Sequence, residues 1–423
     1  MSVIQEPGPR AASPFSIAAI ILSMTILALG NGIIFTYVPY TLARSPDTQW
    51  AAGLSIAAVA FGGLVGSVIA GPLIRRAGHA RLFAVSFALV IISEAVIAMG
   101  VSPWAWIFAR GLFGAAGNMN FIITQSWINH AASNDWRGKA MSFFYMTYVI
   151  GLGLGALLLG RLPEAGNIAP VVAIVFCSLA ILPVSLTRLP IPPAPASVRI
   201  DLPLAWRNSP VAFVGIIAAG GLSTSVQSFT PIYAAMNGVS QDTIATLMFV
   251  MALGLLFVQY PLGALSDRID RRIVLVLTCA IIATAGSIAL GVSFSSFVLL
   301  MIVFSVLAGS AESVYSIASA HANDRADPSY FVPLASTLLI AWSISATCVP
   351  LAISALTPVF GPKTFLFSAI AVAVCYAAFT LLRLRERPQV PPEDRESFEI
   401  KSAQVPDAAA LTQPGAGTPA ENP

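Results

Sequence analysis

Long runs of apolar residues, separated by short polar or basic segments, recur along almost the whole chain. A helix needs roughly 20 mostly apolar residues to cross a lipid bilayer. Twelve runs meet this length, and each predicts one transmembrane helix: 15–40, 50–74, 81–100, 103–127, 139–160, 168–187, 210–234, 242–265, 273–292, 295–320, 331–353 and 364–384. The pattern therefore predicts an all-α integral membrane protein.

The composition agrees with lipid as the main solvent. Of the 423 residues, 57% are hydrophobic and 10% are charged, whereas a soluble domain carries about 25% charged residues because its surface faces water. The four cysteines lie inside apolar runs without a CxxC spacing, which predicts neither disulfides nor a metal site. No cofactor motif occurs, so we expect no cofactor, and the net charge of +3 is too small to indicate a nucleic-acid partner.

The basic residues predict how the chain is threaded. If both termini and the loops after even-numbered runs share one face, that face holds 18 of the 22 Lys and Arg residues. Such loops stay in the cytoplasm during insertion. We therefore expect a multi-pass protein of the bacterial inner membrane, with a short cytoplasmic N-terminus (1–14) and a disordered cytoplasmic tail (386–423).

One loop pattern occurs twice, 192 residues apart. The first copy begins at Gly71 and continues with Arg75 and Arg76, and the second has Gly263, Asp267 and Arg268 at the same spacing. A repeat of this period predicts two homologous six-helix bundles. We expect them to span 15–188 and 210–385, joined by a Pro-rich cytoplasmic linker at 189–209.

Both loops resemble the signature loop of the major facilitator superfamily (MFS), roughly G-x-L-x-D-R-x-G-R-R/K. The segment from Arg110 to Gly114 is similar to the R-x-x-x-G pattern of the same family. The resemblance implies the MFS fold, in which two pseudo-symmetric six-helix bundles enclose a central cavity. It also implies a cytoplasmic gate, in which Asp267 and Arg268 take part. Arg75 departs from the pattern, because the family usually has an acid there.

Two further segments, Gln125–Asn129 and His321–Arg325, resemble a branch of bacterial permeases with poorly defined substrates. The fifth run lacks the Gly-Pro pair that marks the drug–proton antiporter branches, which weakens a drug-efflux interpretation.

Placing an ionisable side chain at the centre of a membrane costs roughly 2.5–3.5 kcal/mol of free energy on insertion scales. Deep in the runs we find Glu94, Arg110 and Glu312. Glu94 and Arg110 each lie eight residues from Ser102, on antiparallel helices, so they share nearly the same depth. They are predicted to form a buried ion pair, or else Arg110 faces the cavity. Glu312 is either a proton-coupling carboxylate or a protonated structural residue.

Polar side chains at helical spacing predict where a solute binds. The resemblance implies that the first, fourth, seventh and tenth runs surround the cavity, and each of them carries such residues. The candidate cavity residues are Asn31, Arg110, Asn118, Gln125, Ser223, Thr224, Gln227, Glu312 and Tyr315.

The working hypothesis is secondary active transport of a small organic solute by alternating access. The expected partners are this solute, protons as a candidate coupling ion, and the lipid bilayer, and we expect a monomer. The alternatives are a passive uniporter and a transporter-like receptor or assembly protein that translocates nothing. An enzyme is not expected, because no HExxH, nucleophile elbow or P-loop occurs.

Overall fold

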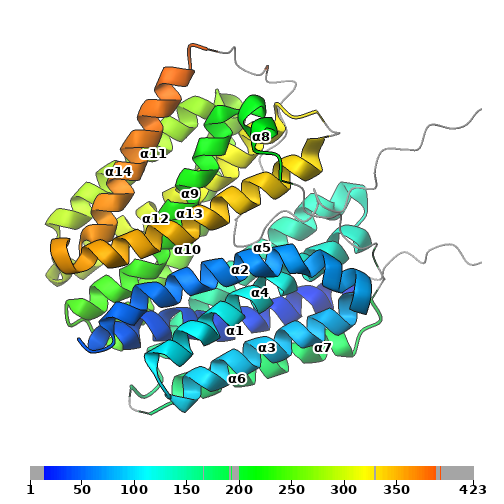
Figure 1. The fold of residues 1–423 in the computed structure, drawn as a ribbon, viewed down its shortest axis with the longest axis vertical. Coiled ribbons are helices and arrows are strands. Elements are labelled where there is room, and N and C mark those ends of the chain that lie inside the picture. Colours follow the sequence, from blue (N-terminus) through cyan, green and yellow to red (C-terminus); the bar gives the residue numbers. More distant parts are fainter. Residues whose placement is uncertain are drawn as a thin grey trace, which may run out of the picture.

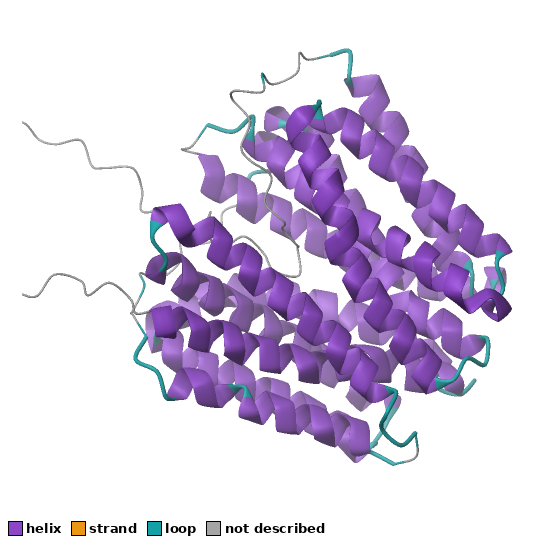
Figure 2. Ribbon diagram, turned by 180° about the vertical axis from the view of Figure 1, so that it is seen from behind, coloured by secondary structure: helices purple, strands orange, loops and turns teal. Residues whose placement is uncertain are grey.

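A computed structural model describes residues 14–164, 166–189, 192, 200–327, 330–386 and 391. Within these residues every regular element is helical (Figures 1 and 2). The helices are α1 (Pro14–Arg44), α2 (Gln49–Ala77), α3 (His79–Met99), α4 (Pro103–Ala131), α5 (Asn134–Leu159), α6 (Ile168–Leu179), α7 (Ile181–Ser185), α8 (Leu202–Asn208), α9 (Pro210–Met236), α10 (Gln241–Arg268), α11 (Arg271–Gly291), η1 (Phe294–Ser296), α12 (Phe297–Asn323), α13 (Phe331–Phe360) and α14 (Thr364–Arg383).

Eleven segments of the described chain are long and apolar enough to cross a membrane. The fourth predicted run is absent from that set, although α4 has 29 residues and connects α3 to α5. Asn118, Asn120, Gln125 and Asn129 lower its hydropathy. A helix that is buried in protein can carry such residues, and residues 119–129 are all buried. With α4 included, the twelve predicted crossings are all present.

The two halves repeat the same packing. In the first half α2 packs against α4 and α1 against α5, and in the second half α10 packs against α12 and α9 against α13. Small residues bring the backbones close. A Cβ atom at Gly114 would clash with the carbonyl oxygen of Val59, and one at Gly309 would lie 2.6 Å from that of Gly254. The predicted fold of two pseudo-symmetric six-helix bundles is confirmed.

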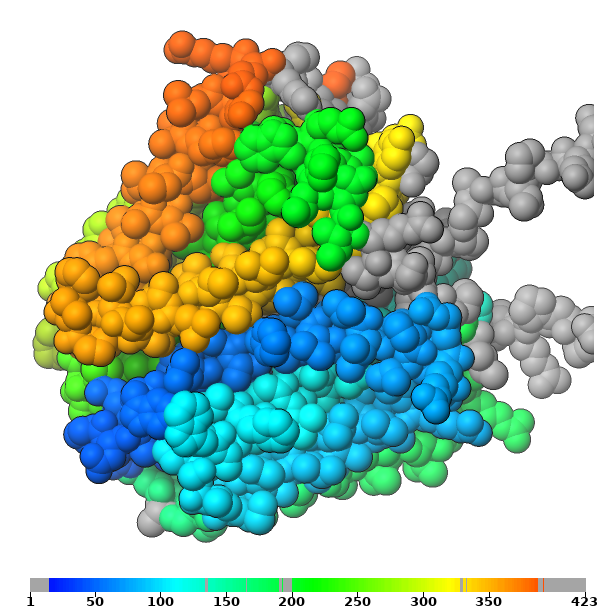
Figure 3. Space-filling view, viewed as in Figure 1, coloured from blue at the N-terminus to red at the C-terminus, as the bar shows by residue number. Residues whose placement is uncertain are grey.

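The bundles meet through α2 with α13, α5 with α10, and α1 with α9. We call the face where α1 begins and α14 ends the tail face, and the opposite one the far face. Gln241 donates hydrogen bonds to the carbonyl oxygens of Leu159 (2.8 Å) and Leu162 (2.9 Å) at the far face. Gly53 lies against Ser354 on the same side. At the far face α2 and α13 lie side by side, and the two helices separate toward the tail face (Figures 1 and 3).

Two predicted segments differ from the structure. The sixth run is two helices, α6 and α7, because Pro183 has no N–H and its ring would clash with the carbonyl of Leu179 in a continuous helix. The predicted linker, 189–209, contains the short helix α8, where Asp201 accepts a hydrogen bond of 2.8 Å from the N–H of Leu204. Residues 1–13, most of the Pro-rich stretch and most of the predicted tail lie outside the described residues.

Candidate functional site

The second bundle contains a polar contact between α9 and α12. Gln227 Nε2 donates a hydrogen bond of 3.2 Å to Glu312 Oε2, and the Glu312 side chain is buried, at 2% exposure. One turn earlier on α9, Ser223 Oγ donates to the carbonyl oxygen of Ala311 at 3.4 Å. Three of the predicted cavity residues therefore lie together, close to the middle of both helices.

Thr224 and Tyr315 flank this contact along the chain. Thr224 directly follows Ser223 and is half-buried, whereas Tyr315 lies three residues after Glu312 and is buried. Residues three apart on a helix share a face, so Tyr315 lies on the Glu312 side of α12.

Arg110 lies between aromatic rings. Its guanidinium carbon is 4.9 Å from the ring centroid of Phe35 on α1 and 4.9 Å from that of Phe113 on α4. The residue is 2% exposed, and its Nε and Nη1 atoms have no hydrogen-bond partner among the described residues. A cation over the faces of two rings is stabilised by their quadrupoles. The two aromatic rings therefore provide favourable contacts for the buried guanidinium of Arg110.

The direct ion pair predicted between Glu94 and Arg110 does not form among the described residues. Glu94 Oε1 instead accepts a hydrogen bond of 3.3 Å from Cys177 Sγ on α6, although the charges of Glu94 and Arg110 still act on each other at longer range. Equal depth along two helices does not determine which way each side chain points, because direction rotates by about 100° per residue. The predicted ion pair rested only on the equal depth of Glu94 and Arg110 in the membrane.

Asn31 and Asn118 differ in their use of hydrogen bonds. Asn31 Nδ2 donates to the hydroxyl oxygen of Tyr148 on α5 at 3.2 Å, and its Oδ1 has no hydrogen-bond partner in the described part of the chain. Asn118 Nδ2 donates to the carbonyl oxygen of Gly63 at 2.7 Å and to Ser67 Oγ at 2.6 Å. Both of these acceptors belong to α2, so the amide of Asn118 joins α2 to α4, whereas Asn31 keeps an acceptor for other partners.

Sequence reasoning missed several buried polar residues. Gln125, which it predicted, is buried in α4. Asn120, Thr124 and Asn129 on the same helix, and Gln259 on α10, are also buried and have side-chain polar atoms that no described residue hydrogen-bonds. Such atoms can bind water or a polar solute. An amide inside an apolar run was the signal that could have identified Asn120, Asn129 and Gln259.

The second copy of the repeated loop forms a buried charge network at the tail face. Arg271 Nε lies 2.6 Å from Asp324 Oδ2 at the end of α12, with both side chains 1% exposed. Arg271 Nη1 also contacts Asp267 at 3.3 Å. Asp267, a predicted gate residue, thus contacts Arg271, which the predicted gate set did not include, whereas Arg268 is exposed.

A second pair in that loop joins Asp270 and Arg272, whose Oδ2 and Nη2 atoms are 2.6 Å apart. Burial raises the pKa of the Asp270 carboxyl, but hydrogen bonds and the charge of Arg272 outweigh burial, so the net pKa is lowered. Asp270 is therefore ionised at neutral pH.

The first copy differs in chemistry. Its arginines, Arg75 and Arg76, are exposed at the end of α2. The buried position that matches Arg271 holds His79, whose Nε2 is 3.1 Å from Ser126 Oγ on α4. The N-terminal loop thus contacts its neighbour through a hydrogen bond to a hydroxyl, where the C-terminal loop uses an ion pair.

Comparison with known proteins supports this architecture. The model of the Major Facilitator Superfamily matches residues 20–237 and again residues 211–414. The chain is 24% identical over 377 residues to an uncharacterized MFS-type transporter of Enterobacter sp. (strain 638), covering 87% of this chain and 96% of that protein. It is likewise 24% identical over 369 residues to the uncharacterized MFS-type transporter YcaD of Escherichia coli O139:H28 (strain E24377A / ETEC), covering 86% and 95%.

Solved structures show the same fold at lower identity. A point mutant of the nucleoside transporter NupG aligns at 12% identity with a TM-score of 0.67, covering 86% of this chain and all of that one. The xylose transporter XylE from E. coli, in a partially occluded inward open conformation, aligns at 14% identity with a TM-score of 0.63, covering 88% and 98%.

Proposed function

The chain belongs to the Major Facilitator Superfamily, and from this premise we propose that it is a secondary active transporter in which Glu312 couples proton movement to solute movement. Family membership and the multi-pass fold make it a membrane transporter for small molecules. The proposal adds the mechanism, which is alternating access of one site between the bundles. We propose no catalytic role.

The contact between Gln227 and Glu312 carries the proposal. A charge in the middle of a membrane protein is costly, so a carboxyl group there must gain a proton or a compensating partner when water is excluded. A glutamine amide suits both states, because its NH₂ group donates to a carboxylate and its carbonyl accepts from a carboxylic acid. Glu312 can therefore change protonation without losing its contact with α9.

The predicted cavity residues and the buried polar groups indicate the class of solute. Asn31, Gln259 and Thr224 are uncharged, and Arg110 is enclosed by aromatic rings. A solute bound there would gain hydrogen bonds to amides and hydroxyls and few ionic contacts. We propose a neutral or zwitterionic polar solute. The structural neighbours named above transport a nucleoside and xylose, which are solutes of this kind.

The contacts between the two bundles at the far face indicate which conformational state of the transport cycle the structure represents. Gln241 and Gly53 hold the two bundles together at the far face. If the basic tail face is cytoplasmic, as the distribution of Lys and Arg favours, this is an inward-facing state of an inner-membrane protein with both termini in the cytoplasm. One chain supplies both bundles, so we propose that a monomer suffices.

Proteoliposomes that contain a pH-sensitive dye would test the coupling. Reconstituted wild-type protein is challenged with a panel of nucleosides and pentoses, and uptake is measured together with internal pH. We expect uptake to acidify the lumen, and Glu312→Gln to abolish acidification while solute exchange between the two sides persists. Glu94→Gln, which changes the other buried glutamate in the same way, is the matched control and should remain coupled.

Two outcomes would contradict the proposal. Uptake without proton movement that Glu312→Gln leaves unchanged would indicate a passive uniporter. Tight binding of a solute without any counterflow would indicate a receptor.

A further inference from the structure

We propose that the short helix α8 is a membrane anchor, which lies in the surface of the bilayer at the tail face and turns Leu202 and Trp206 toward the lipid. The helix has seven residues and directly precedes α9, the first membrane helix of the second bundle. It is separate from the contact between Gln227 and Glu312 in the middle of the membrane helices.

One side of α8 is apolar and exposed. Leu202 is 52% exposed and Trp206 is 42% exposed. Residues four apart on a helix share a face, so these two side chains form one exposed apolar surface. A tryptophan beside a leucine suits the level at which lipid headgroups meet acyl chains, because the indole ring has both an apolar body and a polar N–H group. The occupant that fits this side of α8 is therefore the lipid surface.

The apolar surface of α8 continues the surface of two membrane helices. The ring centroid of Trp206 lies 6.3 Å from that of Phe213 on α9 and 6.5 Å from that of Phe379 on α14. Both helices are long and apolar enough to cross a membrane, and α14 ends at Arg383 with the preceding Leu382 75% exposed. Because Trp206 packs on the terminal turns of two membrane helices, it lies at the level where the bilayer ends.

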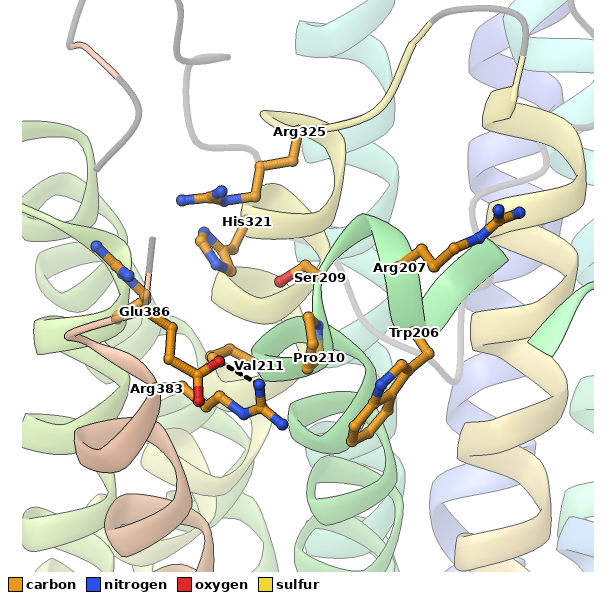
Figure 4. A pocket seen from close by; sticks show the side chains of 10 residues that line it. Trp206, Arg207, Ser209, Pro210, Val211, His321, Arg325, Arg383 and Glu386 are labelled. Carbon is orange, nitrogen blue, oxygen red and sulfur yellow. Dashed lines mark hydrogen bonds and ion pairs between the residues drawn. The ribbon is translucent and has the colours of Figure 1, made fainter. Parts of the chain in front are cut away.

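The surroundings of α8 on the side away from the lipid are basic. Figure 4 shows the ring of Trp206 pointing down beside the membrane helices, whereas the guanidinium of the exposed Arg207 points up and to the side. A pocket of about 260 Å³ borders α8, and its lining includes Arg272, Arg325 and Arg383 from the tail-face ends of α11, α12 and α14. Basic side chains at the ends of membrane helices extend to the headgroup level. The helix thus separates an apolar side from a basic one, which is typical of helices that lie in a membrane surface.

Both ends of α8 are fixed to the second bundle. The backbone N–H of Asp201 donates a hydrogen bond of 2.9 Å to Thr337 Oγ1 on α13. Asn208 Nδ2 donates one of 2.9 Å to the carbonyl oxygen of Ala322 near the end of α12. If lipid holds the apolar side of α8, these bonds also hold the tail-face ends of α12 and α13 at a fixed depth in the membrane.

Spin labels at two positions of α8 would test the anchor. Leu202→Cys and Arg207→Cys, each in a full-length chain without other exposed cysteines, are labelled and reconstituted in phosphatidylcholine liposomes. Power saturation then compares the accessibility of each label to oxygen, which concentrates in lipid, and to a nickel complex, which stays in water. We expect the ratio of oxygen accessibility to nickel accessibility to be several-fold higher at position 202 than at position 207.

Replacing the tryptophan would test its role in the anchor. Trp206→Gln should lower the ratio at position 202 toward the value at position 207, whereas Trp206→Phe, which keeps an apolar ring, should preserve most of it. The matched control is Trp136→Gln, which removes a tryptophan that is 43% exposed near the start of α5 in the first bundle. This control should leave the ratio at position 202 unchanged. If Trp206→Gln does not fold, the comparison of positions 202 and 207 still decides whether α8 meets the lipid.

Three results would overturn the anchor. High accessibility to the nickel complex at both positions would place all of α8 in water. Low accessibility to both reagents at position 202 would show that protein, not lipid, covers this side of the helix. An unchanged ratio in Trp206→Gln would show that the tryptophan does not hold α8 in the membrane surface.

Discussion

His79 and Arg271 occupy the same place in the two repeats, 192 residues apart, and both are buried, yet they bind their neighbouring helices through different chemistry. His79 meets a serine hydroxyl on α4, and Arg271 meets an aspartate at the end of α12. The two bundles share a fold, but the second has a buried ion-pair network at the position where the first has a hydrogen bond. Substitutions at the two loops should therefore have unequal effects.

Asp324→Asn should destabilise the protein by about 3 kcal/mol, because it leaves the buried charge of Arg271 without its closest partner. Ser126→Ala, which removes the partner of His79 in the first bundle, should cost only about 1 kcal/mol. Unfolding of both variants in detergent micelles would measure the difference. Equal losses of stability would show that the ion pair does not distinguish the two repeats.

Asn118→Ala should reduce stability by about 1 kcal/mol, since it removes two part-buried hydrogen bonds between α2 and α4. The KM for solute should hardly change, because the Asn118 amide is engaged between α2 and α4. Asn31→Ala, which removes an acceptor atom that no described residue uses, should instead raise KM. Uptake kinetics and unfolding measured on the same preparations would separate the two effects. A raised KM in Asn118→Ala would place that residue at the solute.

The cation–π contact between Arg110 and Phe35 should be measurable as a coupling energy. In a double-mutant cycle of Arg110→Met and Phe35→Leu, we expect the two substitutions to be coupled by about 1 kcal/mol in unfolding experiments, because the contact is desolvated. Zero coupling between Arg110 and Phe35 would contradict the aromatic environment of the guanidinium.

Gly53→Leu should shift the protein away from this conformation. A Cβ atom at Gly53 would lie 2.7 Å from the Cβ atom of Ser354 across the two bundles, so a larger side chain must push the far face apart. Spin labels at Asp47 and Phe360, in a chain without other exposed cysteines, would report a longer distance. Gly117→Leu is the control, because no described neighbouring atom lies within 4 Å of a Cβ atom at that glycine. An unchanged distance in Gly53→Leu would show that the contact does not hold the far face closed.

Much of the fold was accessible from the sequence. The thickness of the bilayer requires long apolar runs, so the pattern of such runs predicts each crossing from nearby residues alone. The loops beginning at Gly71 and Gly263 revealed the repeat, and the structure confirms two matching bundles. The sixth run also corresponds to one candidate span, Ile168–Ser185, and the prediction missed only its division into α6 and α7 before Pro183.

Partners of the buried polar groups were harder to predict. Apolar periodicity identified Arg110, Asn118 and Glu312 as residues that need partners, because an unpaired polar group is costly in lipid. Which partner each one finds depends on the rotation of its helix and on the segment that packs beside it. Arg110 meets Phe35 from α1, Asn118 meets Gly63 from α2, and Glu312 meets Gln227 from α9.

The amino-acid sequence therefore predicts the number of crossings, their order and the twofold repeat, since each follows from apolar length or from spacing along the chain. Long-range packing sets the contact of Glu94 with Cys177 rather than Arg110, and it brings basic side chains from three helix ends to one pocket. Such contacts join residues far apart in sequence, and a change of one residue in helix register turns a side chain by about 100°. No local pattern contains that information.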